Sequence, residues 1–173
     1  MYRVERVKAH RSELRTTLLN RLRGNVFHVT TQNAWPRIRS EEVVLSNPLA
    51  HPLIKKWEYD AYFRSRSHVS LCDLRSVRDS DLKTALDAYF FLDPRDGCPD
   101  PAFLLLSRSA VERIVTYDEA IDDAKKAGQM IVPFVEAGYP GDLPLAEITD
   151  VLIVDIDRPS PDPFLVALKR YGH

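Results

Sequence analysis

Residues 25–30 read NVFHVT, a run of β-branched and aromatic residues that predicts a short strand. Because successive side chains of a strand point to opposite faces, His28 and Thr30 are expected to share one face. Asn33 follows at the entrance to a short helix predicted for residues 32–39. A strand end followed by a helix start is a common place for polar recognition groups. The alternative interpretation makes His28 a half-buried hydrogen-bonded residue, Thr30 an ordinary strand residue and Asn33 a helix cap.

The rest of the chain predicts helices mixed irregularly with strands, which favours the α+β class. Apolar residues at helical spacing predict one amphipathic helix over residues 3–23, ended by Gly24. A helix is also predicted at 117–126, and strands are predicted at 68–74, 102–106, 130–137 and 151–156. We expect one compact domain with three parts: an N-terminal amphipathic helix over 1–24, a mixed core over 25–157 and a tail over 158–173.

Composition limits the class of protein. The chain has 173 residues, of which 45% are hydrophobic, and this suits a single domain with one core. No apolar run approaches the roughly 20 residues needed to span a bilayer, so no membrane association is expected. Cys72 and Cys98 show no CxxC spacing, and no HExxH occurs, so we expect no disulfide framework and no metal site. A reducing cytoplasm is the expected location. The net charge of −1 argues against a nonspecific grip on nucleic acid.

Glu136 is the second candidate for chemistry. It lies in the apolar segment IVPFVEAGYPGDLPL at residues 131–145. A carboxylate in such a segment is costly to bury without a partner, and a position facing a cleft would remove that cost. The alternative interpretation places Glu136 at a strand end in solvent.

Together these motifs resemble the ADP-ribosyltransferases, and most closely the DarT-type DNA-modifying toxins. His28-Val-Thr30 followed by Asn33 resembles the opening strand of that family. The segment from Glu136 to Ile148, EAGYPGDLPLAEI, is similar to its final active-site segment. Between them, VSLCDLRS at residues 69–76 stands where the family has its central strand. The likeness covers about residues 25–156, with the motifs in the family's order.

The resemblance implies a split β-sandwich, with the N-terminal helix as an addition, that binds NAD as a substrate in a cleft. By analogy, His28, Thr30, Asn33 and Ser70 would bind NAD, and Glu136 would be catalytic. The family also uses an arginine for substrate or phosphate handling. Arg64 and Arg66 are both candidates here, and the spacing does not choose between them. The alternative interpretation makes both of them solvated loop residues.

The activity implied is transfer of ADP-ribose from NAD to a macromolecular acceptor, either nucleic acid or protein. The setting would be that of a bacterial toxin or defence factor, with an antitoxin or another protein as partner. Two other functions remain as alternatives. One is a non-catalytic interaction module on the same fold, whose charged surfaces would bind a partner. The other is an enzyme similar to the RNA 2′-phosphotransferases, which should need additional basic residues around the cleft.

Overall fold

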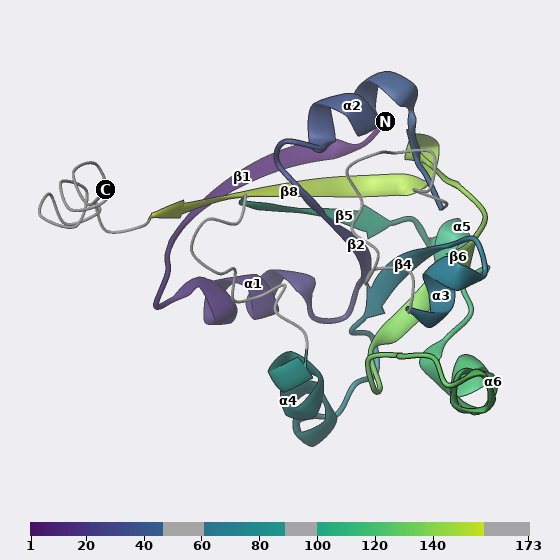
Figure 1. Ribbon diagram of the computed structural model, residues 1–173. Helices are drawn as coiled ribbons and strands as arrows, with labels where there is room; N and C mark the ends of the chain where they lie inside the picture. Colours follow the sequence, from purple (N-terminus) through teal and green to yellow (C-terminus); the bar gives the residue numbers. More distant parts are fainter. Residues whose placement is uncertain (47–60, 89–99, 158–173) are drawn as a thin grey trace, which may run out of the picture.

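The computed structural model describes residues 1–46, 61–88 and 100–157, and it has a mixed α+β architecture (Figure 1). Its main feature is a six-stranded sheet with the order β1-β8-β5-β2-β4-β6. The strands are β1 (Arg3–His10), β2 (Val26–Thr31), β4 (His68–Asp73), β5 (Pro101–Leu106), β6 (Glu136–Pro140) and β8 (Ile148–Asp157). All neighbours in this sheet are antiparallel except β1 and β8, which run parallel. The predicted tail over 158–173 lies outside the described residues.

Helices and a small ribbon surround this sheet. The helices are α1 (Leu14–Leu22), α2 (Trp35–Glu41), α3 (Tyr62–Ser65), α4 (Asp79–Ala88), α5 (Arg108–Val111) and α6 (Tyr117–Ala127), with a 3-10 turn, η4 (Leu145–Glu147). The ribbon pairs β3 (Val43–Val44) with β7 (Leu143–Pro144). Its two strands are also joined by Asp142 Oδ1, just before β7, which accepts hydrogen bonds of 2.7 Å from both the backbone N–H and the hydroxyl of Ser46, just after β3.

The expected helix over residues 3–23 is wrong for its first half. Residues 3–10 form β1, which pairs with β8 from Arg3 opposite Asp150 to His10 opposite Asp157. Glu5, Val7 and Ala9 alternate toward the protein, as the two-residue period of a strand requires. The parallel partner stands about 147 residues away in sequence, so local spacing could not reveal it. The chain therefore begins with an edge strand of the main sheet, and only the second half of the segment is helical.

The sheet separates two apolar clusters. Alternate residues of β5 divide between them: Ala102 and Leu104 pack on one face, and Phe103 packs on the other. The first face is covered by α2, through Trp35 and Ile38. The opposite face is covered by α1 and α4, and Figure 1 shows α1 and α2 on opposite sides of the sheet. The predicted i, i+4 stripe of α1 is confirmed, because its leucines at 14, 18 and 22 are all buried.

The strands at the centre of the sheet separate after two paired residues. β2 pairs with β5 from Phe27 through Thr31, but it pairs with β4 only at Val26 and Phe27. β4 meanwhile continues its pairing with β6 from Cys72 back to His68. The sheet therefore divides beyond Phe27 into a β1-β8-β5-β2 part and a β4-β6 part. We call this division the fork.

Candidate functional site

Three neighbouring strands each contribute one polar residue at the fork. His28 of β2 lies within 2.9 Å of the main-chain oxygen of Ser70 in β4, measured from Nδ1. A carbonyl oxygen only accepts, so Nδ1 carries the hydrogen and donates it. The Ser70 hydroxyl donates to Glu136 Oε1 at 2.8 Å, and the Val132 N–H donates to Glu136 Oε2 at 2.6 Å. His28, Ser70 and Glu136 thus form one hydrogen-bonded chain across β2, β4 and β6.

The register of the strands explains why this chain forms here. Ser70 lies opposite Gly138, whose N–H and C=O both bond to Val115 and not to β4. In an antiparallel ladder this means that the Ser70 main-chain groups face the other neighbour, β2. The β2–β4 ladder has already ended at Phe27, so the imidazole of His28 takes the place of a backbone donor. A part-buried carbonyl that has no backbone partner in β2 is thereby satisfied.

A pocket of about 640 Å³ opens at the fork. This volume falls within the range of small-molecule sites. Five of the residues predicted from the sequence line it: His28, Thr30, Asn33, Arg64 and Ser70. The structure therefore brings the β2 motif, the start of the α2 segment, α3 and the central strand β4 together around one cavity.

The structure also corrects the alternative interpretation of Asn33 as a helix cap. Helix α2 begins at Trp35 with Ala34 at its N-cap position, and no side chain caps it. Asn33 is exposed on the pocket wall instead. Its amide is thus placed to face whatever occupies the cavity.

Glu136 lies behind this pocket and is not part of its lining. Its side chain is buried, with 4% of the residue exposed, so the alternative of a solvated strand end is wrong. It lines a second cavity of about 500 Å³, together with Asp73, Tyr117 and Phe134. The expectation that Glu136 and the His28–Thr30 edge share one concave site is corrected accordingly. The Ser70–Glu136 hydrogen bond links the wall of one cavity to the wall of the other.

The strand predicted for residues 130–137 is wrong except for its last two residues, and this affects how Glu136 is held. β6 begins only at Glu136, and the preceding residues form a turn. Pro133 has no N–H for a ladder, and Phe134 adopts a left-handed φ of 67°. The turn brings the Val132 N–H back onto the Glu136 carboxylate. Glu136 therefore starts a strand, with a backbone donor aimed at it.

Burial sets the protonation of the two titratable groups in this chain. The pKa of His28 is lowered from 6.5 to about 4, mainly by burial and in part by the positive charge of Arg64, against the raising effect of the Ser70 hydrogen bond. His28 is therefore neutral at pH 7, and its Nε2 is an acceptor. Burial raises the pKa of Glu136, while the Val132 N–H, the Ser70 hydroxyl and Arg64 favour its ionised form. The same arginine thus acts electrostatically on both groups.

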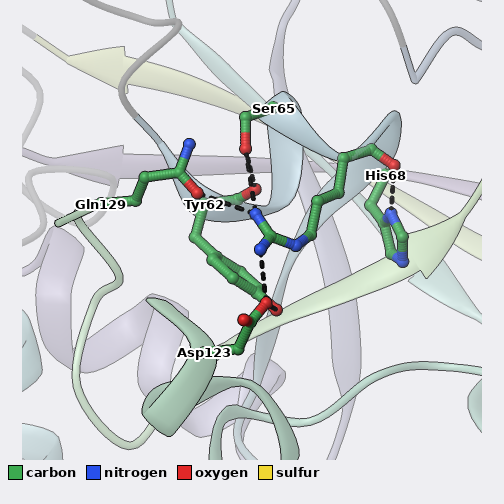
Figure 2. Close-up of polar contacts among 6 residues, drawn as sticks. Tyr62, Ser65, His68, Asp123 and Gln129 are labelled. Carbon is green, nitrogen blue, oxygen red and sulfur yellow. Dashed lines mark hydrogen bonds and ion pairs between the residues drawn. The ribbon is translucent and has the colours of Figure 1, made fainter. Parts of the chain in front are cut away.

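The structure separates the two candidate arginines. Arg64 lines the pocket. The guanidinium of Arg66 turns toward α6, where it pairs with Asp123. It also donates a hydrogen bond of 2.8 Å to Gln129 Oε1, just after that helix, and stacks over the Tyr62 ring of α3 at 4.1 Å (Figure 2). Arg64 is thus the one that can meet a ligand in this cavity.

Sequence reasoning missed His68, which also lines the pocket. Its Nδ1 donates to the main-chain oxygen of Arg66 at 2.7 Å, so Nε2 is its remaining ring nitrogen. The available signal was the spacing from Ser70, because residues i and i+2 of one strand share a face. His68 and Ser70 therefore stand side by side along β4.

Within the described ranges, no group of three or more His, Cys, Asp or Glu residues is arranged to hold a metal ion. No helix in the same ranges has the length and apolar character needed to cross a membrane. No protein-family model, no curated protein sequence and no solved structure matches the chain.

Proposed function

We propose that the protein is an ADP-ribosyltransferase that uses NAD as its substrate and modifies a macromolecular acceptor. The observation that carries this proposal is the His28–Ser70–Glu136 chain, which places a buried carboxylate one hydrogen bond behind the wall of the fork pocket. The motifs that resemble the ADP-ribosyltransferase family supply these same three residues. The split β-sandwich of that family is part of the proposal, and the fork supports it.

The reaction proposed needs a fixed negative charge and no redox step. The bond between ribose C1′ and the nicotinamide nitrogen breaks, and its electron pair leaves with nicotinamide. Positive charge then develops on the ribose ring, as in glycoside cleavage. An acceptor nucleophile forms the new bond to C1′ and releases its proton to solvent. Glu136 would act from one hydrogen bond behind the pocket wall, through the Ser70 hydroxyl, and its charge would stabilise this transition state more than the ground state.

The other pocket residues have roles that suit the same substrate. Arg64 brings the positive charge that a diphosphate needs, and a planar guanidinium binds phosphate oxygens in pairs. Neutral His28 presents Nε2 as an acceptor for a ribose hydroxyl or an amide N–H. Thr30 and Asn33 add a hydroxyl and an amide on the same wall. A dinucleotide with a diphosphate, two riboses and a carboxamide uses all of these groups.

The buried carboxylate argues for catalysis over a purely structural or binding role. Folding raises the pKa of Glu136, so holding it charged lowers stability at neutral pH. A buried carboxylate whose pKa is raised by burial is typical of catalytic sites. We therefore favour the enzyme over that alternative.

The proposal is tested with NAD that carries a radioactive phosphate, incubated with the protein and a bacterial lysate. We expect release of nicotinamide and label on protein, DNA or RNA, which nuclease and protease digestion then distinguishes. Glu136→Gln should lower the rate by at least about 100-fold, as expected when a group that stabilises transition-state charge is removed. Glu112→Gln, at an exposed glutamate of α5's C-terminal end, is the matched control and should be fully active. A wild-type protein that neither binds NAD in calorimetry nor releases nicotinamide would refute the proposal.

A further inference from the structure

Helix α3 is too short to hold its own position. It contains four residues, and isolated helices shorter than about 12 residues are marginal in water. It nevertheless carries Arg64 to the pocket wall. The chain then turns sharply through Ser67, which has a left-handed φ of 56°, and enters β4 at His68. Contacts outside α3 must therefore fix the place of Arg64.

The contacts that hold the end of α3 centre on Arg66. We define the Arg66 cluster as Tyr62, Arg66, Asp123 and Gln129. Tyr62 donates its hydroxyl to Asp123 Oδ2 at 3.0 Å, the same oxygen that pairs with Arg66. Figure 2 shows Tyr62, Asp123 and Gln129 converging on one point. The cluster thus fastens α3 to α6 and to the turn after it.

The main chain of Arg66 contacts the strand that follows α3. Its carbonyl accepts the hydrogen bond from His68 Nδ1, which fixes the plane of that imidazole. Figure 2 shows His68 beyond the cluster, on the side away from Gln129. Arg64 precedes Arg66 by two residues, His68 follows it by two, and both line the pocket. The side chain of Arg66 is anchored in the cluster, and its carbonyl bonds to His68. Arg66 can therefore position both Arg64 and His68.

We infer that Arg66 and Asp123 are positioning residues, which fix Arg64 and His68 on the wall of the fork pocket by docking α3 against α6. Arg66 is thereby reassigned from substrate contact to support. The role in binding NAD rests on the proposed function, whereas the docking of Arg64 does not.

The size of the effect follows from the exposure of the pair. The Arg66 and Asp123 side chains are 34% and 57% exposed, and an exposed ion pair alone contributes little. The cluster adds the Tyr62 hydroxyl, the Gln129 amide and the stacked ring, so its loss should move Arg64 without unfolding the domain. We expect a 3- to 10-fold weaker affinity for NAD, a change about as large as the loss of one modest contact.

The test compares Asp123→Asn with Asp122→Asn, its neighbour on α6. Asp122 is also exposed, and the two substitutions change the charge equally. The pKa of His28, followed by NMR, reports the place of Arg64 directly, because Arg64 lowers it. Displacement of Arg64 should raise that pKa by about half a pH unit. Removal of the negative charge of Asp123 would by itself lower the pKa of His28. A rise in that pKa therefore indicates that Arg64 has moved.

Tyr62→Phe is the second variant, because it keeps the stacked ring and removes only the hydroxyl. It should raise the pKa of His28 in the same direction by a smaller amount. The inference is overturned if Asp123→Asn leaves the pKa of His28 where Asp122→Asn leaves it, or lowers it. The inference is also overturned if Asp123→Asn binds NAD as tightly as Asp122→Asn does. If the wild-type protein binds no NAD, the proposed function fails, and the NMR comparison still decides the docking of Arg64.

Discussion

Gly138→Ala tests the packing that seats α3 on the sheet. A Cβ at this position would lie 2.1 Å from Phe63 Cδ1, 2.7 Å from Cε1 and 2.8 Å from Cγ. Carbon atoms in favourable contact are about 3.5–4.0 Å apart, so the ring must retreat by more than about 1 Å. Phe63 is fully buried and packs beside Tyr62 and the alanines of α6, so it cannot swing into solvent. The helix itself has to move.

We expect Gly138→Ala to lower the free energy of unfolding by about 2 to 3 kcal/mol, in the upper part of the usual range for an overpacked core. For a chain of this size the melting temperature should fall by about 4 to 12 °C. Urea unfolding measures the change, and the decisive comparison is a double-mutant cycle with Phe63→Leu. In the Phe63→Leu background the added methyl should cost less than about 1 kcal/mol. An equal cost in both backgrounds, or an unchanged urea midpoint, would refute the reasoning.

The remaining predictions concern the hydrogen-bonded chain. Glu136→Gln should abolish transfer yet keep the free energy of unfolding within about 1 kcal/mol at pH 7, since Ser70 can turn its hydroxyl to accept from the new amide while the Val132 N–H still finds an oxygen; urea unfolding checks this. Ser70→Ala removes a donor to the carboxylate, so it should raise the pKa of Glu136 and shift the acid limb of kcat/KM to higher pH. Because folding lowers the pKa of His28 from 6.5 to about 4, wild-type stability should fall as pH drops from 6.5 to 4, by at most about 3 kcal/mol, and His28→Gln should lack this loss in urea titrations.

Local patterns predicted correctly those elements whose buried face is visible in the sequence as a regular spacing or run of apolar residues. The leucine stripe of α1 and the apolar run of β5 are examples, and both are where the sequence placed them. Helix α6, predicted at 117–126, ends at Ala127, and Gly128 follows it with the left-handed φ of 64° that a glycine adopts easily. Each of these signals is complete within about ten residues.

The failures share a physical cause. In β1, the spacing of Val4 and Val7 fits a helical stripe, but the strand places them on opposite faces and leaves Val4 exposed, and pairing with β8 decides for the strand. Before Glu136, one proline and one left-handed residue convert an apolar run into a turn. The choice between Arg64 and Arg66 depends on Asp123, which is 57 residues beyond Arg66. In these cases the structure depends on contacts between residues far apart in the sequence or on single backbone conformations, which the local spacing of residues does not show.

The fork and the candidate site depend on each other. Where β2 leaves β4, the Ser70 carbonyl faces a gap that a backbone N–H would normally fill. An apolar residue at position 28 would leave that carbonyl unsatisfied, at a cost of about 1 to 3 kcal/mol, or would let the strands close and fill the pocket. A neutral imidazole avoids both outcomes, because it donates from Nδ1 and keeps Nε2 for a ligand. Only the acceptor role of Nε2 needs an uncharged ring, and the lowered pKa of His28, about 4, keeps the ring uncharged at neutral pH.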